Sequence, residues 1–282
     1  MTLVPLMRAA HPKPTAERKA AELGLALSAM AGSRRPGDTA GDAMTTALRG
    51  GIRLFDLDGC DLILPPAVGV RRVVQARQAG FGDGDRLASG KDVTLLVAGS
   101  SALADRTLWS QAKALRDRGA SERVGIAVEP GGDALGLAKR FKPAVMQIAC
   151  SLLDQRAIRC GALEAIAAMG IEIQLRTSLL RGLLFMPREA LPASLSAAGP
   201  QVSRARRLIA EAGADPLQAA LAFALHRPEA SAVIVPAGSV GEVRALLAAS
   251  AAPLPDLDWP ALALDHSAAL NAEAELYGRA AA

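Results

Sequence analysis

Short apolar runs alternate with helix-period segments along most of this 282-residue chain. Most of the runs are continuous rather than alternating, which is typical of strands buried on both faces. A strand followed by a helix recurs about seven times, and this pattern predicts a parallel α/β protein. The expected strands are Leu25–Met30, Ile52–Asp56, Val93–Ala98, Val124–Val128, Val145–Ala149, Ile171–Arg176 and Ala232–Val235.

Segments whose apolar residues recur at helical spacing fill the gaps between these runs. Gly170 follows one such segment and suits the glycine position just past the end of a helix. The expected helices are Asp38–Arg49, Val68–Ala79, Ala102–Arg118, Ala134–Phe141, Arg156–Met169, Val202–Ala212, Pro216–His226 and Val240–Ser250.

The number of repeats favours a (β/α)8 TIM barrel, for which about 250 residues is usual. A doubly wound open sheet is the alternative, although neither G-x-G-x-x-G nor a Walker loop follows the first strand. We predict a single barrel domain over residues 1–282, because no linker is evident. Pro187–Pro200 is expected to form a long loop, and Pro253–Ala282 a helix with a frayed end.

The composition allows a large core that is poor in aromatic residues. Apolar residues make up 51% of the chain, but Phe, Trp and Tyr contribute only 5, 2 and 1 residues. The interior must therefore be built from Leu, Ala, Val and Ile. The net charge is only +4 and the basic residues are scattered, which argues against a nucleic-acid partner.

The cysteine count and the apolar runs indicate a reduced, cytoplasmic protein. Cys60, Cys150 and Cys160 are odd in number and form no C-x-x-C, so neither a disulfide framework nor a zinc site is expected. The longest apolar run falls short of the roughly 18 residues that a membrane span needs. The first ten residues lack the apolar core of a signal peptide.

Five segments carry motifs that occur in one order along the chain. They resemble, in turn, the second strand, the G-V-S strand, the next strand and turn, the S-P-L-x-x-G-L-L loop, and the last strand with its phosphate-binding helix of the aldo-keto reductase family. The segments are Gly51–Asp56 (GIRLFD), Gly125–Val128 (GIAV), Gln147–Arg156 (QIACSLLDQR), Arg176–Leu184 (RTSLLRGLL) and Ala232–Leu247.

The resemblance implies an NADPH-dependent carbonyl reductase. In that family a Tyr donates the proton, a Lys held by an Asp lowers the pKa of that Tyr, and a His orients the carbonyl. Asp56 matches the family Asp, but Asp61 stands at the Tyr position, and Tyr277 is the only tyrosine. Val97 and Ala98 stand where the His should follow.

The lysine and its strand have no evident counterpart. The 36 residues from Asp56 to Asp92 are too few for two βα units, since one takes about 30. We therefore predict a barrel with one βα unit lost or reshaped between residues 57 and 91. A lost strand would open two edges, to be covered by Leu62–Pro66, by Pro12–Leu23 or by a second copy of the chain.

The cofactor positions are better matched. By resemblance, Gln147 and Ser151 lie in the strand that offers polar groups to the nicotinamide carboxamide. Arg176 takes the place of the aromatic residue that stacks on nicotinamide. Thr177 stands where the family Ser meets the pyrophosphate, and Gly182 and Leu183 match the same cofactor-binding loop.

A phosphate site is expected where the last helix begins. Gly238, Ser239 and Glu242 form an S-x-x-E capping-box pattern, and a helix N-terminus favours an anion. Arg244 lies one turn in and could pair with a 2′-phosphate. The family's basic residue just after the strand is replaced by Ala237 or Gly238.

Three functions remain open. The chain could be a divergent oxidoreductase that binds NADP(H). It could be a catalytically silent barrel that binds a small ligand or a protein partner, or a homo-oligomer. It could be a different enzyme that uses Asp56, Asp61 and Cys60. No metal is expected, because no His accompanies the carboxylates.

Overall fold

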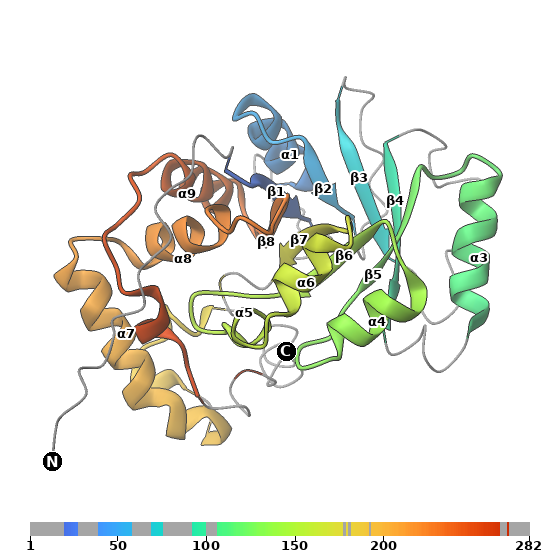
Figure 1. Ribbon diagram of the computed structural model, residues 1–282. Helices are drawn as coiled ribbons and strands as arrows, with labels where there is room; N and C mark the ends of the chain where they lie inside the picture. The colour runs from blue at the N-terminus through green and yellow to red at the C-terminus, as the bar shows by residue number, and fades with distance from the viewer. Residues whose placement is uncertain are drawn as a thin grey trace, which may run out of the picture.

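The computed structural model describes residues 20–27, 39–57, 69–75, 92–99, 106–176, 179, 182–191, 193–265 and 270. Eight parallel strands close into a barrel in chain order, with β8 paired to β1 (Figure 1). This closure confirms the predicted (β/α)8 architecture over an open sheet. The strands are β1 Glu22–Ala26, β2 Leu54–Asp56, β3 Arg71–Gln75, β4 Val93–Ala98, β5 Arg123–Ala127, β6 Val145–Ala149, β7 Glu172–Arg176 and β8 Ala232–Pro236.

The helices lie outside the strands, and their boundaries follow local capping signals (Figure 1). Thr39 and Asp215 cap two of them with capping boxes, and Pro216 opens the second. The α-helices are α1 Ala40–Arg49, α3 Arg106–Asp117, α4 Ala134–Phe141, α5 Arg156–Arg159, α6 Ala162–Ala168, α7 Gly199–Glu211, α8 Pro216–Leu225 and α9 Val240–Ser250. Three 3₁₀ turns are η3 Arg188–Ala190, η4 Ala193–Ala198 and η5 Trp259–Leu262.

Of the βα unit predicted to be lost or reshaped between residues 57 and 91, the strand is not lost, and that half of the prediction was wrong. β3 lies inside the segment expected to be the helix Val68–Ala79, and it pairs with both β2 and β4. The prediction failed because the βα units here are short: β3 begins 17 residues after the start of β2, and β4 begins 22 residues after the start of β3. No open edge therefore lies between these strands, and the reason for Leu62–Pro66, Pro12–Leu23 or a second copy to cover one disappears. Residues 12–19 and 62–66 lie outside the described chain.

Two further predictions are corrected in their boundaries. The first strand is Glu22–Ala26 rather than Leu25–Met30, because Glu22 can lie inside the barrel where Arg71 pairs with it. The helix expected over Arg156–Met169 is divided into α5 and α6, because the chain turns at Gly161 with a φ of 71°. Only glycine adopts this left-handed conformation without steric cost.

The barrel interior has an apolar middle and a charged floor. Successive strand residues point to opposite faces, so every second residue enters the barrel. The apolar interior cluster consists of Leu54, Val73, Leu96, Ala127, Ala232 and Ile234. At the amino-terminal ends of the strands, the ion pairs Glu22–Arg71 and Arg123–Glu172 form the floor.

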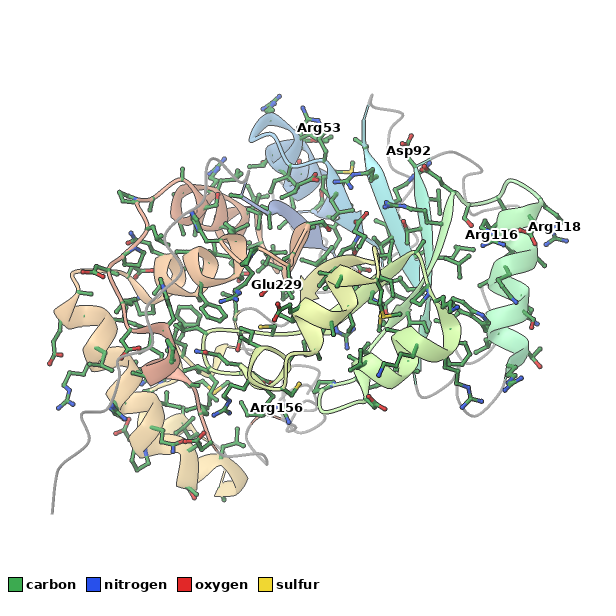
Figure 2. The ribbon with its side chains drawn as sticks, in the orientation of Figure 1. Arg53, Asp92, Arg116, Arg118, Arg156 and Glu229 are labelled. Carbon is green, nitrogen blue, oxygen red and sulfur yellow. The ribbon has the colours of Figure 1, made fainter. Side chains whose placement is uncertain are left out.

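Surface charge and helix length complete the description. Arg53, Arg116 and Arg156 lie in separate parts of the molecule, with Arg116 on the outlying helix α3 (Figure 2).

No single helix in the described ranges is long and apolar enough to cross a membrane. The helices Leu195–Glu211 and Pro216–Leu225 reach the length and composition of a membrane span only when they are taken together, and they are bent by 90° relative to each other.

Candidate functional site

Asp56 is a buried carboxylate at the end of β2, and two amides hold it. Its Oδ2 accepts hydrogen bonds from Gln75 Nε2 at 3.1 Å and from Gln147 Nε2 at 3.0 Å. Only 3% of Asp56 is exposed. Two N–H donors on one oxygen stabilise the ionised carboxylate, since a carboxylate only accepts hydrogen bonds. The structure thus brings together Asp56 and Gln147, two of the residues chosen from the sequence.

Three successive strands end with residues that differ in part from the family pattern. β2 ends at Asp56, β3 at Gln75 and β4 at Ala98. The resemblance implies Asp, Lys and His at strand ends of this kind. Gln75 is neutral, so it can hold Asp56 by a hydrogen bond but cannot place a positive charge beside it. Sequence reasoning misses Gln75, because the pattern over Val68–Ala79 predicts a helix and not a strand.

A hydrogen-bonded polar chain runs from Asp56 to the barrel floor. Gln147 Nε2 also donates to Gln174 Oε1 at 3.3 Å, and Gln174 Nε2 donates to Glu172 Oε1 at 3.0 Å. Glu172 forms an ion pair with Arg123. We call these five residues, Asp56, Gln147, Gln174, Glu172 and Arg123, the polar chain. Both glutamines are fully buried.

The sequence carries a signal for part of the polar chain. In β7 the polar residues Glu172, Gln174 and Arg176 alternate with Ile173 and Leu175. This period of two predicts a strand with one polar and one apolar face. The polar face points into the barrel, and the apolar residues pack beneath the helices.

Gln147 is left with one acceptor atom that no described residue satisfies. Its amide nitrogen donates to both Asp56 and Gln174. Its Oε1 is buried and has no hydrogen-bond partner among the described residues. A buried acceptor without a partner costs about 1–3 kcal/mol. A ligand that offers an N–H or O–H group to this atom would offset that cost.

An arginine from α7 holds the loop after β7. The guanidinium of Arg206 donates to the carbonyl oxygens of Leu184 at 2.7 Å and Leu183 at 3.1 Å, and also to that of Met186. Gly182 opens this turn with a φ of 81°. Gly182 and Leu183 therefore lie in a loop of fixed shape. No local sequence pattern indicates the role of Arg206, because its partners lie 20 or more positions away.

α9 begins after β8 with only half of the expected capping box, because Glu242 accepts from the backbone N–H of Gly238 instead of from that of the N-cap residue Ser239. Ser239 Oγ accepts from Glu242 N at 3.1 Å, and Glu242 Oε2 accepts from Gly238 N at 2.7 Å. Arg244 is exposed one turn further along the helix. The carboxylate of Glu242 thus occupies one of the N–H groups that an anion would use, while Arg244 adds a positive charge nearby.

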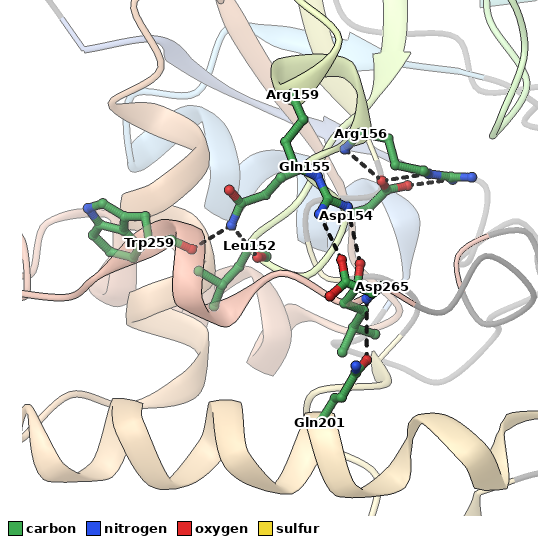
Figure 3. A network of polar contacts seen from close by, with 9 residues as sticks. Leu152, Asp154, Gln155, Arg156, Arg159, Gln201, Trp259 and Asp265 are labelled. Atoms are coloured by element: carbon green, nitrogen blue, oxygen red, sulfur yellow. Dashed lines mark hydrogen bonds and ion pairs between the residues drawn. The ribbon is translucent and has the colours of Figure 1, made fainter. Parts of the chain in front are cut away.

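The turn after β6 has a structural role. Ser151 Oγ accepts from Asp154 N at 2.9 Å, which makes this hydroxyl part of the turn. Buried Asp154 accepts from Arg156 Nε at 2.9 Å and Nη2 at 2.7 Å (Figure 3). This hydrogen bonding raises the pKa of Arg156, because it favours the charged guanidinium. The QIACSLLDQR motif therefore shapes a turn as well as contributing Gln147.

The same turn anchors the segment that follows α9. Gln155 Nε2 donates to Trp259 O at 2.6 Å, and Arg159 pairs with Asp265 at 2.7 Å (Figure 3). The backbone N–H of Leu264 donates to Leu153 O at 2.8 Å. Residues more than 100 positions apart are joined here.

Several expected site residues lie outside the described chain. These are Asp61 with its neighbours Asp58 and Cys60, and Thr177. Arg176 ends β7 beside Ala149 of β6, at the carboxyl end of the barrel. Barrel enzymes place their active sites at this end. Within the described ranges, no group of three or more His, Cys, Asp or Glu side chains could hold a metal ion.

Comparison with solved structures supports the barrel. The apo form of aldo-keto reductase AKR11C1 from Bacillus halodurans superposes with a TM-score of 0.65, at 20% identity over 83% of this chain and 87% of that one. Its holo form gives 0.61, at 18% identity over 76% and 81%. A Pseudomonas aeruginosa protein described as an aldo-keto reductase gives 0.57, at 14% identity over 82% and 90%. At these identities the likeness shows the fold alone.

Sequence comparison shows the family. No curated protein sequence matches the chain. The model of the aldo/keto reductase family matches residues 102–263, more than half of the 282 residues. The match begins after β4, so β1–β4 and Asp56 precede it, and it ends after η5. The chain belongs to the aldo/keto reductase family.

Proposed function

We propose that the chain binds a nicotinamide nucleotide at the carboxyl end of its barrel and does not reduce carbonyls through the family's Tyr, Lys and His. Members of the family generally bind NADP(H). The observation that carries the proposal is the buried Oε1 of Gln147, which has no partner among the described residues and lies beside Asp56. A carboxamide N–H suits this acceptor.

The residues at hand fit such a nucleotide. Gln147 and Arg176 would hold the nicotinamide end, and Gly182 and Leu183 the pyrophosphate. Ser239 and Arg244 at α9 would hold the adenosine phosphate, because helix N–H groups and a guanidinium both favour anions. The bound dihydronicotinamide would supply a hydride. The protein would supply orientation and shield the site from water.

The proposed site lacks the family's proton donor. Reduction of a carbonyl needs an acid within hydrogen-bond reach of the new alkoxide. Asp56 Oδ2 is already engaged as the acceptor of two N–H hydrogen bonds, from Gln75 and Gln147. Gln75 and Ala98, at the ends of β3 and β4, carry no charge. These residues therefore best support a protein that binds a nicotinamide nucleotide but lacks the family's Tyr, Lys and His for proton transfer.

Calorimetric titration with NADPH, and with NADH at the same salt, tests the binding. We expect saturable heat with the wild type, tighter binding of NADPH, and at least tenfold weaker binding by Gln147→Met, the range of one buried hydrogen bond. Gln111→Met, on the exposed face of α3, is the matched control and should bind as the wild type does. No heat with either nucleotide from folded protein would refute the proposal and leave a protein- or ligand-binding barrel.

Turnover is measured separately. NADPH oxidation at 340 nm, with a panel of aldehydes and ketones, should stay at the background rate. Saturable turnover would contradict the second half of the proposal and would point to a substitute proton donor. Loss of that turnover in Asp56→Asn and Asp61→Asn, with nucleotide affinity unchanged, would identify an enzyme that uses these carboxylates instead.

A further inference from the structure

The polar chain occupies space that apolar residues could fill. The rest of the interior cluster is Leu, Val, Ile and Ala. Asp56, Gln147 and Gln174 are at most 3% exposed. Each buried polar group must keep its hydrogen bonds or cost free energy. Apolar side chains at these positions would need no hydrogen bonds, so the presence and arrangement of the polar side chains need a reason.

The two ends of the polar chain fix the orientation of the amides between them. Asp56 and Glu172 are carboxylates, which only accept hydrogen bonds when ionised. Glu172 therefore takes the amide nitrogen of Gln174, which turns Gln174 Oε1 toward Gln147. Asp56 and Gln174 then take both hydrogens of Gln147 Nε2. The oxygen of Gln147 is the atom left over.

We infer that Glu172 and Gln174 are positioning residues, which hold the amide of Gln147 with its oxygen presented as an acceptor to an N–H donor of the bound ligand. This inference rests on the proposed function, in which that donor is the carboxamide of the nicotinamide nucleotide. Neither positioning residue needs to touch the ligand. The ion pair with Arg123 keeps Glu172 in place at the floor.

A variant of the floor releases the constraint. Glu172→Gln keeps the shape but can offer an amide N–H to Gln174 Oε1. Gln174 can then turn over and offer its nitrogen to Gln147 Oε1, which occupies the acceptor. The matched control is Glu22→Gln, because Glu22 forms the other floor ion pair, with Arg71, and no described contact joins it to the polar chain.

The orientation of the Gln147 amide is tested by comparing the binding of NADP⁺ with that of its 3-acetylpyridine analogue. The analogue has a methyl group in place of the carboxamide NH₂, so it carries the same charge as NADP⁺ and lacks the N–H donor. We expect wild-type protein and Glu22→Gln to bind NADP⁺ about 5- to 100-fold more tightly than the analogue, the range of one buried hydrogen bond. In Glu172→Gln the ratio of the two Kd values should fall to within about twofold. Gln174→Met provides the same test if Glu172→Gln does not fold.

The outcomes separate this inference from the proposed function. If wild-type protein binds both nucleotides within about twofold of each other, the inference fails and nucleotide binding stands. If folded wild-type protein binds neither, both fail. An equal loss of preference in Glu22→Gln and Glu172→Gln would mean that the whole floor matters and would overturn the positioning role of Glu172.

Discussion

Gln75 donates its side-chain amide to the carboxylate of Asp56 at 3.1 Å across the neighbouring strands β3 and β2. A lysine in this place would bring a positive charge to the carboxylate. Glutamine brings only a dipole, so it fixes the orientation of Asp56 by a hydrogen bond without a neighbouring positive charge. Gln75 therefore offers no charge with which to lower the pKa of a proton donor beside it.

Removal of this amide should weaken the fold. Gln75→Met keeps similar volume but leaves Asp56 with one donor fewer, so the free energy of unfolding should fall by about 1–3 kcal/mol. Urea denaturation measures the change. Gln111→Met, on exposed α3, should stay within about 0.5 kcal/mol of the wild type. In an Asp56→Asn background the cost of Gln75→Met should shrink, and an unchanged cost would show that the two residues are not coupled.

Arg206 should control the order of the loop after β7. Arg206→Lys keeps the charge but loses the planar fork that reaches the carbonyls of Leu183, Leu184 and Met186. We expect faster amide hydrogen exchange over residues 182–186, and nucleotide affinity several-fold lower at nearly unchanged Tm. Arg207→Lys is the neighbouring control, because Arg207 is exposed and pairs only loosely with Glu211 at 3.6 Å. Equal effects of the two substitutions would show that Arg206 does not hold the loop after β7.

The barrel could be predicted where strands read as unbroken apolar runs. Val93–Ala98 and Val145–Ala149 have the predicted boundaries, because their inward and outward residues are both largely apolar. β3 was missed because Arg71, Arg72 and Gln75 break the run. Their partners lie on other strands, and local patterns carry no information on pairing between distant strands.

The site shows the same division. Asp56 and Gln147 could be found from motifs, and Ser239 with Glu242 from capping chemistry. Gln174, Glu172 and Arg206 gain their roles only through contacts made by the closed barrel. Asp61 and Thr177 lie outside the described residues, so their roles stay predictions. The absence of the family's Tyr, Lys and His stays a prediction from the sequence, whereas the place of Gln75 on β3 beside Asp56 could be found only from the structure.

Gly125 should tolerate no side chain. A Cβ there would lie 2.4 Å from the carbonyl oxygen of Val145 and 2.6 Å from a methyl carbon of Leu96. The oxygen belongs to the barrel ladder and cannot move away, so Gly125→Ala should cost about 3 kcal/mol, the upper part of the overpacking range. Gly241→Ala, in the first turn of α9, meets only Ser239 Oγ at 3.7 Å. It should stabilise the protein by up to about 1 kcal/mol, since alanine is the better helix former. Thermal unfolding of both variants checks the opposite signs.

Cys150 should make the protein less stable in alkali. Burial, with a further contribution from the charge of Asp154, raises the pKa of its thiol from 9.0 to about 12. Between these two values the unfolded chain loses the thiol proton while the folded chain keeps it, so stability falls as the pH rises through this window and is unaffected below it. The free energy of unfolding from urea denaturation at about pH 8, 9 and 10 should decline more steeply for the wild type than for Cys150→Ala, by an extra slope that approaches about 1.4 kcal/mol per pH unit. Cys150→Ala removes a buried group, so the comparison uses slopes rather than absolute stabilities. Cys160→Ala, at an exposed thiol, should follow the wild-type slope, and parallel slopes for all three proteins would contradict a buried neutral thiol at position 150.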